Sequence, residues 1–144
     1  MRAFIPSILS VILIAVIASV PARSDPLSEI PADIADIRLF GSWEDDAVSG
    51  IYRGIVSVPE PGRSRFTLQW VAFKADGSLG TVSHSMPVPE VSEIEGIITG
   101  YRGEVDEQGL TVFLDIQERP EALEDTYVLY VNGPDDYLFE GASN

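Results

Sequence analysis

The side chains able to do chemistry are few in this chain of 144 residues. His84 is its only histidine, and there is no cysteine. A Ser-His-Asp triad would therefore have to use His84, and the composition excludes thiol nucleophiles, disulfides and Cys-ligated zinc. A lone histidine in a strand is usually exposed or hydrogen-bonded without a catalytic role. We therefore predict that the protein is not an enzyme.

Carboxylates are abundant and could act in pairs. Glu44, Asp45 and Asp46 are consecutive, and so are Asp135 and Asp136. Two carboxyl groups at a suitable separation could hydrolyse a glycosidic bond. Acidic turns could also bind calcium weakly, although these acids lack the regular spacing of a calcium loop. No spacing singles out one pair, so a carboxylate-dependent hydrolase is a distant alternative, and we predict no metal site and no cofactor.

Aromatic side chains suggest a binding surface instead. The segment QWVAF is apolar on both faces of its predicted strand, so that Trp70 points inward and Phe73 outward. The same alternation directs Phe113 and Tyr130 away from the core. These residues would form an exposed apolar surface unless a short helix, a loop or a second sheet covers them. Tryptophans such as Trp43 and Trp70 most often belong to the core of a small β protein, and a wall of a ligand pocket is the alternative.

Two arginines belong to a repeated tripeptide. Tyr-Arg-Gly occurs at 52–54 and again at 101–103, which chance alone explains in a chain of this length. In each copy the tyrosine and the arginine should point to opposite faces of a strand, and the glycine should relieve crowding. Arg53 and Arg102 either pair with carboxylates or, if left unpaired in a pocket, anchor an anion. We include both in the predicted ligand or partner surface.

The charge balance limits the partners. Nine Lys and Arg stand against 23 Asp and Glu, for a formal net charge of −14 at pH 7. Such a surface repels phosphate backbones and anionic lipid headgroups. We therefore expect a small apolar ligand or a protein partner, no nucleic acid, and contact with a membrane only through the N-terminal segment.

The N-terminal segment resembles an export signal. Arg2 precedes an apolar run from Phe4 to Val20, and small residues allow cleavage after Ala22 or Ser24. A retained membrane anchor is the alternative, because about 17 apolar residues are just enough to cross a bilayer. We therefore divide the chain into a signal peptide or anchor at 1–24 and a single β-rich exported domain at 25–144, periplasmic or secreted.

Periodicity predicts an all-β domain. Residues 25–37 are typical of one short helix, with Pro31 in the first turn. Later runs alternate with period two and are bounded by turn sequences. The predicted strands cover residues 38–43, 51–58, 66–73, 79–86, 94–105 and 110–117, followed by a hairpin around 132–136. We expect a small antiparallel barrel or a curved sandwich of about eight strands.

One tripeptide resembles a family motif. Gly41, Ser42 and Trp43 follow a predicted short helix and open the first predicted strand, an arrangement similar to that of the calycin barrels, the lipocalins and the avidin group. In those families the tryptophan closes one end of the barrel. In lipocalins an arginine near the end of the strand series packs across it, whereas the last arginine here, Arg119, precedes the final hairpin. The C-terminal helix of lipocalins is also missing. The resemblance implies the architecture and no particular ligand.

These observations favour two functions. The first is a non-catalytic exported binding module for a small apolar ligand or a polypeptide. The second is a membrane-tethered accessory subunit that docks on a larger complex. An interior cavity would favour the first function, and a solid core with an apolar outer patch would favour the second.

Overall fold

The predicted all-β fold is confirmed. The computed structural model describes residues 30–142, which form eight strands and one short helix. In chain order these elements are β1 (Ile34–Asp45), β2 (Val48–Glu60), β3 (Arg63–Phe73), β4 (Leu79–Val88), α1 (Pro89–Glu93), β5 (Ile97–Asp106), β6 (Gly109–Gln117), β7 (Asp125–Gly133) and β8 (Asp136–Gly141). The predicted signal or anchor segment at 1–24 lies outside the described residues.

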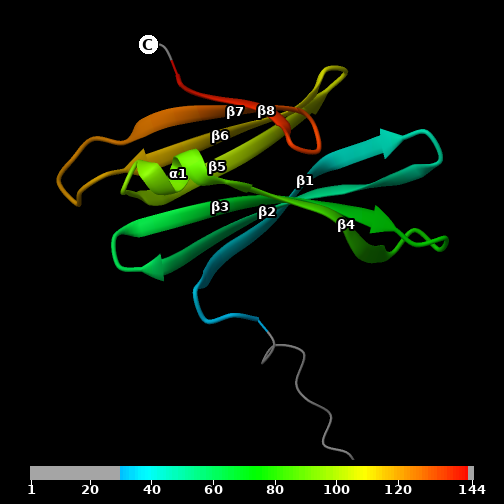
Figure 1. Cartoon of the computed structure of the whole chain (residues 1–144), viewed down its shortest axis with the longest axis horizontal. Coiled ribbons are helices and arrows are strands. Elements are labelled where there is room, and N and C mark those ends of the chain that lie inside the picture. The colour runs from blue at the N-terminus through cyan, green and yellow to red at the C-terminus, as the bar shows by residue number, and fades with distance from the viewer. Residues whose placement is uncertain (1–29, 143–144) are drawn as a thin grey trace, which may run out of the picture.

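The strands form two antiparallel sheets. The first sheet has the order β1-β2-β3-β4 and the second has the order β5-β6-β7-β8. They lie as two layers in Figure 1, with α1 between them at one end. Because α1 carries the chain from β4 into the other layer, β4 and β5 do not pair, and the strands do not close into a barrel. Of the two predicted architectures, the structure has the sandwich of two sheets.

The predicted helix over residues 25–37 is wrong for the part that the structure describes. Strand β1 begins at Ile34, which pairs with Ser57, and Ile37 pairs with Ile55. Pairing with β2 satisfies the backbone groups of this segment, and β-branched isoleucine fits a sheet surface well. Residues 25–29 of the predicted helix lie outside the described residues.

The short helix α1 was not predicted from the sequence. Pro89 occupies its first turn together with the acidic Glu90, a usual arrangement for a helix start. The hydroxyl of Tyr137 in β8 donates to the carboxylate of Glu90 at 2.9 Å and ties the helix to the second sheet. Among residues 30–142, no helix has the length and apolar content needed to span a membrane.

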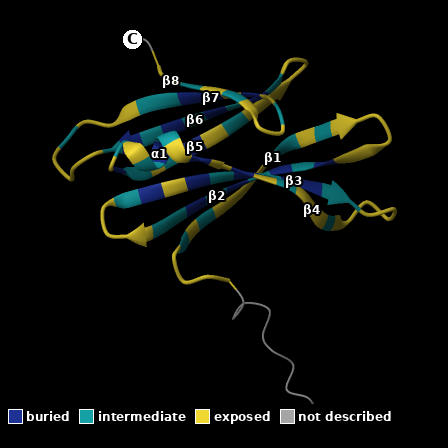
Figure 2. Cartoon of the chain, viewed as in Figure 1, coloured by how far each residue is buried: buried dark blue, intermediate teal, exposed yellow. Residues whose placement is uncertain are grey.

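The core lies between the inner faces of the two sheets. In β6 the predicted alternation is confirmed, because Leu110, Val112, Leu114 and Ile116 are buried. Figure 2 shows buried residues alternating with more exposed ones along the strands of both layers. Val71, which alternation directs outward, is only 2% exposed. Val71 does not belong to the core cluster between the sheets. Its cross-strand neighbours are Ile51 in β2 and Val82 in β4.

The two Tyr-Arg-Gly segments meet in this core around Phe40 of β1. Tyr52 and Tyr101 are buried, and the edge-to-face pair of Phe40 and Tyr101 has a centroid distance of 5.9 Å. A Cβ atom at Gly54 would come within 2.8 Å of the Phe40 ring, and one at Gly103 within 2.5 Å. The glycines therefore make room for the ring of Phe40, a residue of a different strand.

Candidate functional site: an aromatic cleft between the sheets

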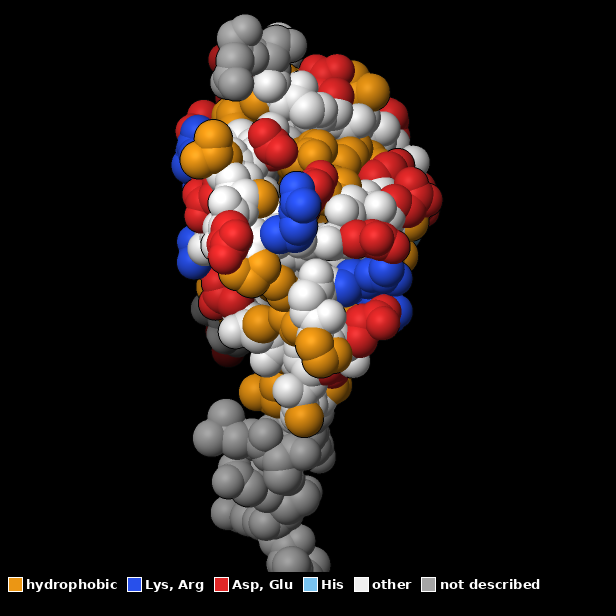
Figure 3. Space-filling model, turned by 90° about the vertical axis from the view of Figure 1, so that its left-hand side faces the viewer, with side chains coloured by type: hydrophobic (Ala, Val, Ile, Leu, Met, Phe, Trp, Pro, Cys, Tyr) orange, Lys and Arg blue, Asp and Glu red, His pale blue; other side chains and the backbone are white. Residues whose placement is uncertain are grey.

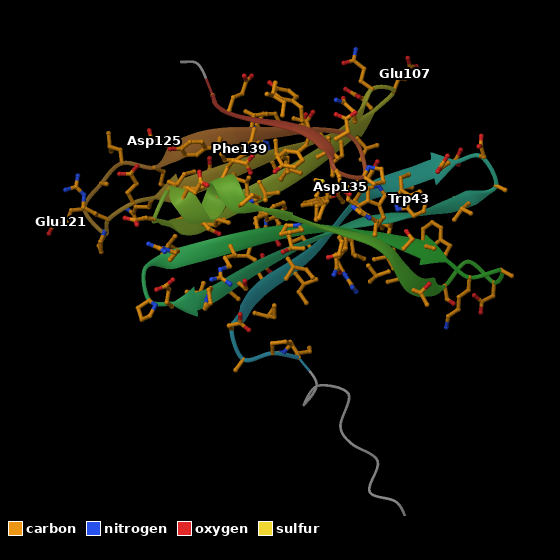
Figure 4. The ribbon with its side chains drawn as sticks, viewed as in Figure 1. Trp43, Glu107, Glu121, Asp125, Asp135 and Phe139 are labelled. Carbon is orange, nitrogen blue, oxygen red and sulfur yellow. The ribbon has the colours of Figure 1, made fainter. Side chains whose placement is uncertain are left out.

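A cleft of about 620 Å³ opens where the two sheets diverge. The hairpin that joins β1 to β2, the inner faces of β3 and β4, and the turn after β7 enclose it. Figure 4 shows Trp43 of β1 and Asp135 of the β7–β8 turn at this end, with Glu121 at the opposite end. The lining residues are Trp43, Glu44, Asp45, Val48, Tyr52, Trp70, Ser83, His84, Asn132, Gly133 and Pro134.

A row of rings forms one wall of the cleft. Tyr52, Trp70 and His84 lie directly opposite one another on β2, β3 and β4. The Trp70 ring meets Tyr52 at a centroid distance of 5.6 Å and His84 at 5.3 Å, both edge to face. Because antiparallel pairing fixes neighbouring side chains on one face, three regular strands hold this wall in place.

Trp43 forms another part of the wall. It pairs with Gly50 across the β1–β2 hairpin, and a Cβ atom at Gly50 would lie 2.6 Å from Cζ2 of the indole. Only glycine therefore lets the indole approach the neighbouring strand so closely. The indole Nε1 is buried and has no hydrogen-bond partner among the described residues. A buried donor without a partner costs free energy, so this atom is a place where an acceptor would stabilise the protein.

His84 is held by a carboxylate from the other sheet. Its Nε2 lies 3.0 Å from Oδ1 of Asp135, while about 29% of the imidazole side chain remains exposed. The hydroxyl of Ser83 donates to the backbone carbonyl of Trp70 at 3.2 Å, which directs its proton away from His84. These three residue types are therefore neighbours without the hydrogen-bond chain of a catalytic triad.

The charged lining of the cleft is acidic. Glu44 and Asp45 are exposed on its rim, and His84 also lines it. Within residues 30–142, no lysine or arginine lines the cleft. The opposite end differs, because basic side chains lie there among carboxylates and apolar groups (Figure 3). The cleft therefore offers negative charge at its mouth and apolar rings inside.

The structure distributes the six predicted surface residues over three places. Trp70, which is 4% exposed, belongs to the core and also lines the cleft. In β2, Arg53 follows the inward-facing Tyr52 and therefore lies on the outer face of the first sheet. In β3, Phe73 is an odd number of positions from the inward-facing Trp70 and lies on the same outer face. Phe113, Arg102 and Tyr130 lie on the outer face of the second sheet. The predicted single surface is therefore divided.

The two predicted arginines have different partners. Arg53 donates to Oε1 of Gln69, with its Nε at 2.9 Å and its Nη2 at 2.6 Å. The prediction that Arg53 pairs with a carboxylate is wrong, because the side chain opposite it on β3 is the amide of Gln69. Arg102 lies 3.6 Å from Glu104, and its guanidinium carbon stands 4.2 Å from the centroid of Phe113. Neither arginine lines the cleft.

Sequence reasoning missed most of the cleft. Alternation could have placed Tyr52 and His84 on the inner face beside Trp70, because all three lie in strands with period two. The sequence carries no comparable signal that brings the β7–β8 turn against β4. The bond between Asp135 and His84 spans 51 positions and depends on how the sheets are stacked.

Other features of the described residues offer weaker sites. No group of three or more His, Cys, Asp or Glu side chains that could hold a metal ion is present among them. The described residues that line a hollow at the β6–β7 loop are residues 119–122, which all belong to that loop.

Comparisons with protein-family models, curated proteins and solved structures give no match. The similarity of Gly41, Ser42 and Trp43 to the calycin motif therefore remains a hypothesis. In the structure these residues lie in the second half of β1, where the pairing register with β2 shifts between Leu39 and Ser42.

Proposed function

We propose that this protein is an exported binding protein without catalytic activity, and that the aromatic cleft is its ligand site. The observation that carries the proposal is the convergence of Trp43, Tyr52 and Trp70 on one cleft of about 620 Å³. Sites for small molecules have volumes of about 300–1,000 Å³ and are lined mostly by apolar and aromatic groups. The ligand would stack on these rings, with its polar groups facing Asn132 and the rim.

The positions of the rings support this proposal. They project from paired strands, so the site keeps its shape before the ligand arrives, and little conformational entropy is lost on binding. Tyr52 and Trp70 also pack in the core between the sheets, in one cluster with the fully buried Leu68 and Leu129. The packing of the core therefore holds the rings that line the cleft.

Export is the second part of the proposal. It rests on Arg2, the apolar run from Phe4 to Val20 and the cleavage sites after Ala22 or Ser24. Mass measurement of the protein recovered from its own host is the test. A mature chain beginning at Arg23 or Asp25 supports export with cleavage, an intact chain in the membrane fraction supports the anchor, and an intact chain in the cytoplasm contradicts export.

The tryptophans provide the binding assay. The chain has two, Trp43 and Trp70, and both line the cleft. We would record the two indole N–H resonances of the purified protein while adding a panel of small neutral, cationic and anionic organic molecules. We expect at least one member of the panel to shift both resonances together.

A matched pair of variants tests the location. The Cβ position of Gly133, in the cleft, has no atom within 4 Å, and the same holds for Gly141 in β8. Gly133→Phe should therefore fill the cleft without disturbing the fold and abolish the shifts, whereas Gly141→Phe should preserve them. A panel that shifts neither indole, or shifts that survive in Gly133→Phe, would contradict the proposal.

Docking on a larger complex is a second candidate function. On the outer face of the second sheet, Tyr130 is 40% exposed and pairs with Leu138, which is 54% exposed. Exposed apolar neighbours of this kind occur in protein interfaces. Native mass measurement of the protein from its own membrane and soluble fractions would detect a bound polypeptide, and a mass of the chain alone in both fractions would argue against docking.

A further inference from the structure

We infer that the ligand of the aromatic cleft is an organic cation, an ammonium or guanidinium group attached to an apolar body. The inference rests on the proposed function of the cleft and names the chemical class that the site would take. Three features support it: the charges that line the cleft, the arginines that cover two aromatic rings elsewhere in the protein, and the net charge of the chain.

The charges at the mouth of the cleft favour a positive ligand. Glu44 and Asp45 line it, and Asp135 lies beside it, bonded to His84. An anionic ligand would be repelled by these carboxylates, and a neutral ligand would gain nothing from them. A cation at the rim would be attracted to them while its apolar part contacted the rings.

Two aromatic rings outside the cleft are covered by the protein's own arginines. The guanidinium carbon of Arg38 stands 4.4 Å from the centroid of Tyr101, and that of Arg102 stands 4.2 Å from the centroid of Phe113. A cation over an aromatic face is attracted by the negative charge of the π system. The cleft holds the two tryptophans, whose rings attract cations most strongly, yet no lysine or arginine of the described chain lines it. A cation from outside could occupy this place.

The net charge would favour capture of such a ligand. A chain with a formal charge of −14 attracts cations over distances comparable with the screening length of the solution. Glu44 and Asp45, which line the mouth of the cleft, would add to this attraction. We therefore expect binding to weaken as salt is added.

The test compares molecules of equal shape and different charge. Choline is a trimethylammonium alcohol, and 3,3-dimethyl-1-butanol replaces its nitrogen with carbon and is neutral. Each is titrated into the purified full-length protein while tryptophan fluorescence is recorded. A cation–π contact together with the rim carboxylates should make choline bind about tenfold more tightly than the neutral alcohol. Raising the ionic strength to about 1 M should reduce this preference.

Two double variants test the role of the rim. Glu44→Gln/Asp45→Asn removes two exposed charges at the cleft, and we expect it to weaken choline binding severalfold and leave the neutral alcohol unaffected. Glu121→Gln/Asp125→Asn removes the same residue types at the opposite end of the molecule (Figure 4) and should leave both affinities unchanged. Circular dichroism of both variants would show that the fold is intact.

A second pair of probes identifies the source of the cation. The peptide acetyl-Gly-Lys-Gly-amide is compared with the same peptide carrying norleucine in place of lysine. Preference for the lysine peptide over choline would assign the cation to a polypeptide, and the reverse would assign it to a small molecule; either result supports the inference.

The remaining outcomes overturn it. If each cation and its neutral counterpart bind equally, the cleft is a ligand site but its ligand is not a cation, so the proposed function stands and the inference falls. If no cation changes the fluorescence while the neutral or anionic panel members shift the indole resonances, the inference falls in the same way. If nothing binds, both fall.

Discussion

The ring of Phe40 packs against glycines from both sheets, Gly54 and Gly103. A methyl group at Gly103 would lie 2.5 Å from Cδ1 and 2.6 Å from Cγ of Phe40. The same ring also packs against Gly54, so it has little room to move away. We expect Gly103→Ala to lower the free energy of unfolding by about 1–3 kcal/mol through overpacking. Urea denaturation followed by circular dichroism would measure the loss.

A double-mutant cycle tests this contact. When Phe40→Ala has removed the ring, adding Gly103→Ala should cost much less, because the clash is gone. Gly141→Ala in β8, where nothing lies within 4 Å of the Cβ position, is the control and should be nearly neutral. A cost for Gly103→Ala that is equally large in both backgrounds would contradict the proposed clash.

Tyr137 gives the protein a weakness at alkaline pH. Burial and the hydrogen bond to the Glu90 carboxylate raise the pKa of Tyr137 from 10.0 to about 12. Since the neutral phenol is favoured in the folded protein, its contribution to stability is complete below about pH 10 and is lost as the pH rises towards 12. We expect Tyr137→Phe to lose less stability than the unmodified protein over this range, as measured by urea denaturation at several pH values.

The titration itself provides a control. In Glu90→Gln the neighbouring charge is gone, so the pKa of Tyr137 should fall towards its ordinary value, and absorbance at alkaline pH would follow the phenol. A Tyr137→Phe variant with an unchanged dependence would contradict the prediction.

Among the elements, β3 and β5 are joined by a buried polar contact. Ser64 is fully buried; its hydroxyl accepts from the backbone N–H of Ile98 at 2.9 Å, and its own N–H donates to the carbonyl of Gly96 at 2.8 Å. Ser64→Ala leaves the Ile98 N–H without this partner, at a cost of about 1–3 kcal/mol. Chemical denaturation would measure the loss, and amide exchange at Ile98 should become faster.

The control for this contact is a serine on the surface. Ser42→Ala, at an exposed position of β1, should change stability little. If the exchange rate of the Ile98 amide is the same in Ser64→Ala as in the unmodified protein, the hydroxyl does not protect it, and the role assigned to Ser64 as a link between the sheets is wrong.

The strands after Val48 could be predicted because local signals agree there. The buried residues of β6 alternate with period two, as the sequence predicts. Gly62, Gly77 and Gly109 have positive φ in the turns that the sequence predicts between strands. The start of β1 could not be predicted, because Pro31 and the spacing of Ile34 and Ile37 also fit a helix. Pairing with β2, a contact between distant residues, decides between the two.

The cleft illustrates the same limit at a larger distance. Local alternation is enough to place Tyr52, Trp70 and His84 on one inner face. It cannot show that the inner face becomes a cleft at one end and a packed core at the other, because this depends on the stacking of two sheets. Trp43 is ambiguous in the sequence, where a core tryptophan and a ligand-contacting tryptophan have the same pattern.

At the scale of the whole molecule, the sandwich separates two kinds of apolar surface. Trp70 faces the cleft, whereas Phe73, three positions further along β3, lies on the outer face, paired with Leu79, and is only partly buried. Leu79 is 44% exposed and Val82 is 41% exposed beside it. Through one face this segment would contribute to the proposed ligand site. Through the other it would contribute to a docking surface on the first sheet, distinct from the one around Tyr130 and Leu138 on the second sheet.

Substitution of Phe73 should separate these functions. We expect Phe73→Ser to lower the free energy of unfolding by only about 1 kcal/mol, because its ring is partly exposed, and to leave binding in the cleft unchanged. Association with a polypeptide partner, measured by native mass, should weaken. Phe66→Ser is the matched control: Phe66 is 1% exposed, and its loss should cost several-fold more and unfold much of the population. If Phe73→Ser unfolds the domain as Phe66→Ser does, Phe73 belongs to the core and the outer face loses its main support as a binding surface.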